Sequence, residues 1–310
     1  MFLQIVNLIL PIAAALTLGM AGRKRGWFGD EGINAFKNIV SKVMLPLVLF
    51  NAMLTAEYTA SALFTVVGCF LGLCLALAIG FALRRVFPQY GKYMPFMIST
   101  CESGMIGYPL IAMLFGVLGV QRFAMVDLPQ TVFFFVVAAS LLQVADGLKP
   151  SAASLLRNIF TAPPFDGMLA GMILGLLNVD GLLSQTALWE TYTTLIEFLT
   201  GPTTVLILLF LGYSLSFKRE LLKAVAVTAL LRLLVMGAVG ALVKFMLFRF
   251  VPYDRILMFA VLLLFLLPPS FAVPMFSRLE GSAEYIATTI SFCTVVTLLL
   301  FIVMAVFAFA

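Results

Sequence analysis

The stretch Cys101–Gly116, CESGMIGYPLIAMLFG, lies inside a long apolar segment and decides the fold. It contains the carboxylate Glu102, the glycines Gly104 and Gly107, and Pro109 close together. Proline removes a backbone donor from a helix, and glycine loosens it. A charge at mid-membrane costs at least ~2.5–3.5 kcal/mol. The stretch therefore predicts an interrupted membrane helix with an acidic group that needs a functional or structural explanation.

The composition defines the class of protein around this stretch. The 310 residues have a mean hydropathy of +1.14, with 63% hydrophobic and only 11% charged residues. Apolar runs of about twenty residues recur along the chain, each long enough to cross ~30 Å of hydrocarbon as a helix. They lack the alternation of barrel strands. The fold class is an all-α polytopic membrane protein.

Several functional classes are excluded by composition. There is no histidine, which removes the commonest general base and zinc ligand. The four cysteines lie in apolar runs, which indicates buried hydrophobes rather than disulfides or a metal site. The net charge of +5 is typical of basic loops facing an anionic leaflet, not of nucleic-acid binding. We expect no enzyme, no cofactor, no metal cluster and no nucleic-acid partner.

Turn residues and charges divide the chain into ten predicted spans. They lie near 2–21, 34–55, 60–83, 93–116, 120–143, 163–178, 190–214, 223–247, 256–278 and 284–308. The first is an uncleaved span rather than a signal peptide, because its basic residues follow the apolar run instead of preceding it. Both termini are expected on the outer side of the plasma membrane, because this orientation places most Lys and Arg residues on the cytoplasmic side. The residues on the predicted cytoplasmic side are Arg23, Lys24, Arg25, Lys37, Arg84, Arg85, Lys92, Lys149, Arg157, Lys218, Arg219, Lys223 and Arg278.

The two halves of the chain share short motifs in the same order. Pro46 in span two corresponds to Pro202 in span seven, and FPQY at 87–90 corresponds to FVPY at 250–253. PLIAMLFG at 109–116 matches PMFSRLEG at 274–281 in its proline, leucine and glycine. Because each half has five spans, the second half enters the membrane inverted, as in many secondary transporters. The predicted units are residues 1–143, a cytoplasmic link at 144–162, and residues 163–310.

Spans four and nine are the two that the sequence predicts to be broken. Span nine contains Pro268, Pro269 and Pro274 in LLPPSFAVPMFSR, and span four has its glycines before Pro109. One proline only kinks a helix, whereas three so close together favour local unwinding. Paired broken helices in corresponding halves indicate a transport site.

Two ionisable residues are predicted near the middle of the membrane. Glu102 lies ten residues beyond Lys92, or about 15 Å at helical rise, and Arg232 lies at similar depth in span eight. They could form a salt bridge with each other. Alternatively, Glu102 is a proton or sodium coupling group, and Arg232 a counter-charge or substrate ligand. Asp127 and Glu197, nearer the outer ends of their spans, are assigned structural or vestibular roles.

Five motifs together resemble the auxin efflux carrier family, which includes bacterial malate and malonate permeases. They are LPLVLFNAML at 45–54, SGMIGYPLIAMLFG at 103–116, APPFDGMLAGMILGLL at 162–177, GPTTVLILLFLGYSL at 201–215 and PPSFAVPMFSRLEG at 268–281. The resemblance implies a fold like that of sodium/proton antiporters and bile-acid symporters. It implies a dimerising scaffold of spans one, two, six and seven, and a mobile transport domain of spans three to five and eight to ten. Spans four and nine would cross at the site.

One position departs from the family pattern. The family commonly carries an asparagine seven residues before the span-four proline, where this chain has Glu102. Either a cation or proton neutralises Glu102, giving symport or exchange, or the substrate is neutral or cationic. The candidate substrate-binding residues are Asn51, Glu102, Ser103, Gly104, Gly107, Tyr108, Pro109, Arg232, Pro269, Ser270 and Pro274, with H⁺ or Na⁺ coupled through Glu102.

The sequence therefore favours a plasma-membrane carrier of a small organic acid that works by alternating access, expected as a homodimer in the lipid bilayer. The alternatives are a cation-coupled exchanger with a neutral or cationic substrate, and a uniporter without ion coupling. A passive channel is disfavoured because inverted repeats with broken helices are typical of gated carriers. A membrane-embedded enzyme would need acidic metal motifs or a Ser/Lys pair, and neither is visible.

Overall fold

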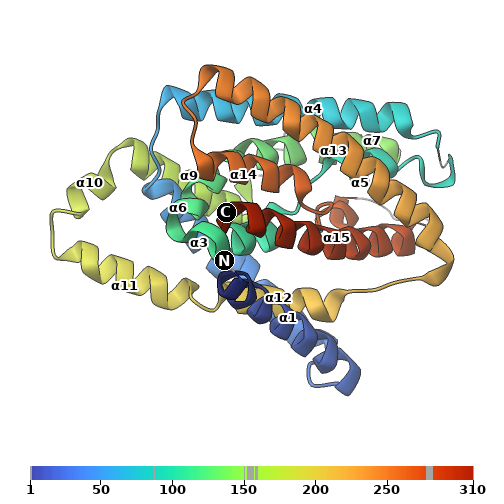
Figure 1. Ribbon diagram of the computed structural model, residues 1–310, viewed down its shortest axis with the longest axis horizontal. Coiled ribbons are helices and arrows are strands. Elements are labelled where there is room, and N and C mark those ends of the chain that lie inside the picture. The colour runs from blue at the N-terminus through green and yellow to red at the C-terminus, as the bar shows by residue number, and fades with distance from the viewer. Residues whose placement is uncertain are drawn as a thin grey trace.

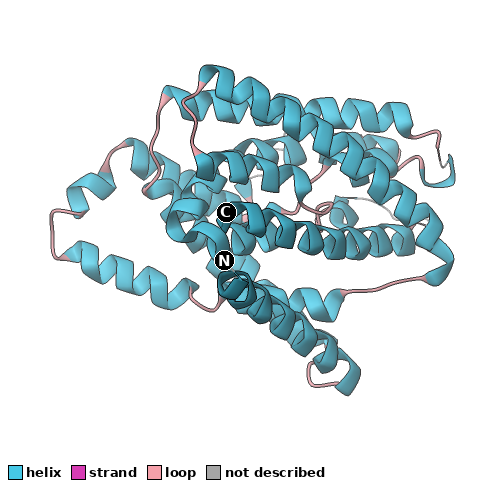
Figure 2. Cartoon of the chain, in the orientation of Figure 1, coloured by secondary structure: helices cyan, strands magenta, loops and turns pink. Residues whose placement is uncertain are grey.

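The computed structural model describes residues 2–86, 88–149, 151, 157, 160–276 and 282–309. Within these ranges the chain is helical, with no strand (Figure 2). The α-helices are α1 Phe2–Arg25, α2 Asp30–Ile39, α3 Leu45–Leu54, α4 Ala60–Leu83, α5 Met94–Ser99, α6 Tyr108–Val132, α7 Ala139–Ala145, α9 Pro163–Leu176, α10 Val179–Leu183, α11 Leu188–Thr200, α12 Thr203–Ser214, α13 Leu222–Phe250, α14 Arg255–Leu266 and α15 Ala283–Phe309. Shorter π-helical turns occur at Val40–Met44, Ser103–Gly107 and Phe133–Ala138, and 3₁₀ turns at Pro88–Tyr90, Arg219–Leu221 and Val273–Phe276.

Seven stretches of the described chain are long and apolar enough to cross a membrane. They are Val6–Arg25, Glu31–Leu54, Ala60–Leu83, Met94–Ala145, Leu188–Ser214, Arg219–Phe250 and Ala283–Phe309. The number is smaller than the ten predicted spans because the fourth stretch joins two of them, and α9 and α14 are shorter than a full crossing. The multi-pass helical class is thus established, and the ten-span inverted arrangement stays a prediction.

Gly116 divides the longest stretch at the predicted boundary between spans four and five. Its φ of 57° and ψ of −143° interrupt α6 between two helical runs. An L side chain rarely adopts this backbone conformation, so a glycine is favoured at this turn. The chain therefore kinks at Gly116, between two helical runs.

Two helix pairs cross closely through small residues. In α9, Gly167, Gly171 and Gly175 lie four residues apart and face the backbone of α3. In the other pair, Gly19 of α1 and Gly212 of α12 face each other's helix backbone. Figure 1 shows α1 and α12 side by side near the N-terminus, and these two pairs are among the most extensive helix contacts of the molecule. Small residues allow such close approach where no hydrophobic force drives helices together in lipid.

We expect Gly171→Ala to weaken this scaffold. A Cβ at Gly171 would lie so close to the Phe50 carbonyl oxygen that α3 and α9 would have to separate. Overpacking of this kind costs about 1–3 kcal/mol, so the thermal midpoint in detergent should fall. Gly237→Ala in α13 is the matched control, because a methyl group added there would meet nothing within 4 Å. Equal midpoints for the two variants would contradict the close-packing account.

The remaining long helices form a second group. The helix α4 packs on α5, α6 and α13, while α14 packs on α6 and α13. In Figure 1, α4 and α13 run alongside each other above the rest. At one end of this group, Lys92 Nζ lies 2.5 Å from the buried carboxylate of Asp146. The hydrogen bond with Asp146 raises the pKa of Lys92, which keeps this ammonium charged and fixes the start of α5 against the end of α7.

Some sequence predictions lie outside the described residues. Phe87 of the first FPQY motif, Arg278, and the matched leucine and glycine of the second-half motif at 277–281 are not described. The predicted link at 144–162 is described only at 144–149, 151, 157 and 160–162.

Candidate functional site

Two non-helical segments meet inside the second helix group. The chain leaves α5 at Thr100 and re-enters a helix at Ser103, and it leaves α14 at Leu267 and turns again at Val273. The backbone N–H of Glu102 donates to the Pro268 carbonyl over 2.9 Å. The N–H of Ser270 donates to Thr100 Oγ1 over 3.2 Å. The breaks therefore satisfy part of each other's backbone, as unwound segments inside a membrane protein require.

The Glu102 carboxylate lies at the meeting point of these segments. Its Oε1 accepts the N–H of Met105 over 3.2 Å, which caps the helix that continues into α6. Its Oε2 accepts the N–H of Phe271 over 2.6 Å and faces the Ser270 hydroxyl at 3.5 Å. Backbone N–H groups at a helix start favour an anion. The side chain is 9% exposed, so the chain's own carboxylate fills an anion site built from both breaks.

Arg232 lies at the carboxyl ends of α5 and α14, the two helices that precede the breaks. Its Nη1 donates to the carbonyls of Met97 and Ile98 over 2.8 and 2.7 Å, at the end of α5. Its Nε and Nη2 donate to the Leu267 carbonyl over 3.2 and 2.5 Å, at the end of α14. Helix C-termini carry partial negative charge, which a cation stabilises. Arg232 thus joins the ends of two short helices.

The salt bridge between Glu102 and Arg232, one of the two possibilities that the sequence left open, does not form among the described residues. Among the ion pairs of the described residues, none joins these two side chains. Each charge is satisfied by backbone dipoles of opposite sign instead. The pairing was inferred from similar depth alone, and depth does not give the direction in which a side chain points.

Asp127 is the site residue that the sequence pattern did not reveal. It is 2% exposed, and its Oδ2 accepts the Tyr108 hydroxyl over 3.0 Å. Gln130 and Thr131 lie on the same helix face, where Gln130 Nε2 donates to the Cys101 carbonyl over 2.7 Å. The signal was available: Asp127, Gln130 and Thr131 are three and four residues apart, which places polar groups on one face of an apolar helix. Of the two roles assigned to Asp127, structural or vestibular, the vestibular one does not fit this burial.

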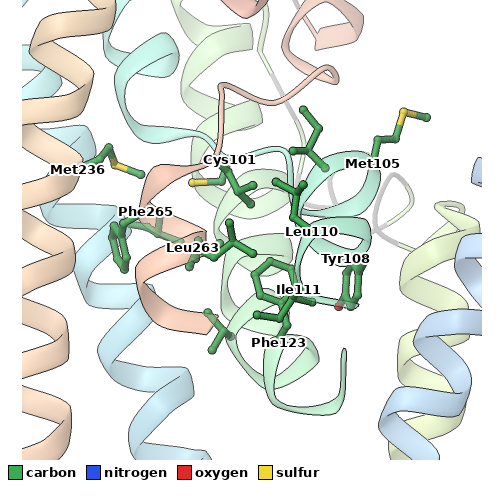
Figure 3. Close-up of a cluster of buried hydrophobic side chains, with 14 of the residues drawn as sticks. Cys101, Met105, Tyr108, Leu110, Ile111, Phe123, Met236, Leu263 and Phe265 are labelled. Atoms are coloured by element: carbon green, nitrogen blue, oxygen red, sulfur yellow. The ribbon is translucent and has the colours of Figure 1, made fainter. Parts of the chain in front are cut away.

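Apolar side chains enclose the polar centre. Figure 3 shows Leu263 of α14 directed towards Ile111 and Phe123 of α6 near the break at Cys101, whereas Phe265 points to the opposite side of α14, towards Met236 of α13. Phe123 meets the Tyr108 ring edge-on at 5.0 Å. These contacts surround the break with apolar groups and hold the Tyr108 ring in place.

A cavity of about 270 Å³ lies between the two helix groups. Its polar lining comes from Asn51 of α3, Gln121 of α6, and Thr200, Thr203 and Thr204 near the start of α12. Tyr108 and Pro109 form the wall nearest the break. Asn51 Oδ1 accepts the Tyr192 hydroxyl over 2.9 Å, and Gln121 Nε2 donates to Thr55 Oγ1 over 2.6 Å. The cavity offers amide and hydroxyl groups and no charge.

The predicted site residues therefore fall into three places. Around the Glu102 carboxylate lie Ser103, Gly104, Pro269 and Ser270 in the two broken segments. Around the cavity lie Asn51, Tyr108 and Pro109.

The remaining predicted site residues, Gly107, Pro274 and Arg232, lie neither beside the Glu102 carboxylate nor at the cavity. Gly107 packs under Phe123, whose ring leaves no room for a side chain. Pro274 lies in the 3₁₀ turn Val273–Phe276, and Arg232 is turned towards the helix ends. Within the described ranges, no cluster of three acidic, cysteine or histidine side chains could hold a metal ion.

A multi-pass helical membrane protein with a buried carboxylate at paired helix breaks has the features of a membrane transporter. Comparison of the sequence with protein families agrees. The family described as membrane transport protein, which is the auxin efflux carrier family, matches residues 4–307, and the chain belongs to it. The chain is also 24% identical over 253 residues to an uncharacterized transporter of Methanothermobacter thermautotrophicus, which covers 79% of this chain and 80% of that protein.

Proposed function

We propose that this transporter is a secondary active carrier of a small organic acid, which works by alternating access and couples transport to protons through Glu102. The observation that carries the proposal is the position of the Glu102 carboxylate on the N–H groups of Met105 and Phe271. These donors form the anion site of the broken helices. The family relationship supports transport. Because the Glu102 carboxylate occupies both N–H groups, its protonation is coupled to binding of the substrate anion in this proposal.

Coupling follows from competition for the same donors. When Glu102 is ionised, both of its oxygens are engaged and an external carboxylate finds no free N–H there. When Glu102 binds a proton, it accepts hydrogen bonds weakly and gains a donor of its own. A substrate carboxylate then takes the N–H groups. Proton and organic anion bind together, which gives symport without net charge.

The packing of the helices supports the proposed inverted repeat. If the second half of the chain repeats the first, α1 corresponds to α9. The segment containing α3 then corresponds to the segment containing α12. The contact of α1 with α12 then corresponds to the contact of α9 with α3, and both use glycines. These four elements are the proposed scaffold, and α4 to α7 with α13 to α15 are the proposed mobile domain. The scaffold is also the proposed surface for a homodimer.

The cavity between these two groups is the proposed route of the substrate. It touches scaffold residues such as Asn51 and Thr203, and mobile residues such as Tyr108 and Gln121. A substrate bound there would be carried across when one group slides against the other. In the proposed orientation, with both termini outside the plasma membrane, the Gln121 end of this cavity faces outward.

A second candidate function is an exchanger for a neutral or cationic substrate. It is favoured by the same engaged carboxylate, because an ionised Glu102 repels an anion at this position. A sodium ion beside Glu102 would replace the proton as coupling ion in that case. A uniporter would use neither ion.

Counterflow in proteoliposomes tests the proposal. The purified protein is screened by thermal shift against small mono- and dicarboxylic acids at several pH values, with and without sodium. The acid that gives the largest shift is then used as labelled substrate. We expect saturable uptake, accumulation driven by an imposed proton gradient, and acceleration by unlabelled acid inside. Gradient-independent uptake would support the uniporter, and sodium-driven uptake the exchanger.

A further inference from the structure

We propose that Asp127 is a second proton-carrying residue of this transporter, which passes protons between the cavity and Glu102 by way of Tyr108. The inference rests on the proposed coupling role of Glu102. It assigns a function to a buried acid that binding of the substrate does not require.

The hydrogen bonds place the three groups in sequence. Tyr108 forms part of the cavity wall, and its hydroxyl donates to Asp127 Oδ2 over 3.0 Å. The Ser103 hydroxyl donates to Gln130 Oε1 over 3.2 Å and lies beside the Asp127 carboxylate. Ser103 directly follows Glu102 in the chain, and the charge of Asp127 acts on Glu102. A hydrogen bond therefore joins Tyr108 of the cavity wall to Asp127, and Ser103 lies beside Asp127 in the segment that carries Glu102.

The chemistry of the partners distinguishes Asp127 from a purely structural acid. The hydroxyls around it, of Tyr108, Ser103 and Thr131, can each donate or accept a hydrogen bond. They can therefore satisfy Asp127 as a carboxylate or as a neutral acid by rotating. The short contacts of Glu102 are instead with backbone N–H groups, which only donate, and the Ser270 hydroxyl lies further away, at 3.5 Å. Asp127 can release and take a proton with little rearrangement, as a relay residue must.

The transfer conserves protons at each step. A hydronium ion in the cavity gives a proton to the Tyr108 oxygen while the Tyr108 O–H proton passes to the Asp127 carboxylate. Asp127, now neutral, gives its proton to the Ser103 oxygen, and the Ser103 hydroxyl turns away from Gln130 and passes its own proton to Glu102. Both hydroxyls end neutral, Asp127 returns to carboxylate, and Glu102 is protonated.

Tyr108 donates to Asp127, and the other titratable groups on which the charge of Asp127 acts are Glu102 and the thiol of Cys101. Charged side chains on the described elements packed against α6 are engaged elsewhere. Arg255 of α14 donates to carbonyls at the end of α15, and Glu284 of α15 pairs with Lys218. Within α6, Arg122 pairs with Asp254 and Glu57. No fixed cation competes with the proton at Asp127 in this part of the described chain.

Infrared spectroscopy after a pH jump tests the relay on the full-length protein in lipid nanodiscs. The carboxylic-acid band that Glu102→Gln removes reports protonation of Glu102. We expect Asp127→Asn and Tyr108→Phe each to slow the rise of this band on the order of a hundredfold, as for loss of a positioned proton carrier. Asp127→Glu should restore much of the rate. Glu197→Gln, an exposed acid of α11, is the matched control and should keep the original rate.

The variants separate a relay from simple electrostatics. Tyr108→Phe keeps the charge of Asp127 and removes only the hydroxyl between it and the cavity. An unchanged rate in Tyr108→Phe would overturn the relay, as would an unchanged rate in Asp127→Asn. Failure of the coupling proposal looks different: Glu102→Gln would then remove a band while proton-driven uptake stays intact.

Discussion

Glu102→Gln is expected to abolish the pH dependence of transport while the protein still folds. In the proposed cycle, uptake falls about tenfold per pH unit above the point where Glu102 loses its proton, because one proton is bound per turnover. Glutamine has nearly the same shape and is permanently neutral, so this slope disappears. Its single oxygen accepts from only one of the Met105 and Phe271 N–H groups. Uptake by the variant should be flat with pH and unable to accumulate substrate against a gradient.

The measurement is initial uptake in proteoliposomes at fixed internal pH and varied external pH. Size-exclusion chromatography and the thermal midpoint check that the variant is folded. Glu197→Gln serves as the matched control, because that side chain is exposed and distant in sequence from the breaks. If Glu102→Gln retained the pH slope and the accumulation of the wild type, proton coupling would have to reside elsewhere.

Arg232→Met is expected to destabilise the fold more than any other single change at the site. Arg232 is 3% exposed and satisfies the carbonyls of Met97, Ile98 and Leu267 at two helix ends. Methionine fills similar space but donates no hydrogen bond. Each buried carbonyl left unsatisfied costs about 1–3 kcal/mol, so a loss of several kcal/mol is expected.

Thermal unfolding in detergent, followed by tryptophan fluorescence and by limited proteolysis, measures this loss. Arg232→Lys is the graded control, since it keeps the charge but loses the planar fork that reaches several carbonyls at once. Its midpoint should fall between those of the wild type and Arg232→Met. A stable Arg232→Met protein that no longer binds substrate would instead make Arg232 a substrate ligand.

The local sequence predicts much of this architecture. Long apolar runs require helices in a bilayer, because no other open structure satisfies the backbone in hydrocarbon. Proline and glycine act within one or two turns, so Pro268, Pro269 and the SGMIG segment before Pro109 mark where helices end. The family is likewise readable from motif order, since it covers almost the whole chain. These properties depend on neighbouring residues alone.

The partners of the charges were decided by tertiary structure. Glu102 and Arg232 have similar depth and opposite sign, yet each is directed to backbone groups of residues far away in sequence. The structural or vestibular role of Asp127 was predicted from its distance to the end of its span. The orientation of its helix instead directs the side chain into the interior, beside Tyr108. Helix rotation and the approach of two distant breaks follow from packing across the whole molecule, which a linear pattern does not specify.

The sequence by itself therefore determined the membrane class, the family and the positions of the helix breaks, because hydrophobicity and backbone chemistry are local. Only the tertiary structure decided that backbone N–H groups hold the Glu102 carboxylate and that Arg232 joins two helix ends. It also decided that Asp127 is buried and accepts the Tyr108 hydroxyl. Hydrogen bonds of 2.5 to 3.2 Å require atoms from separate segments to meet, and that meeting exists only in the folded chain.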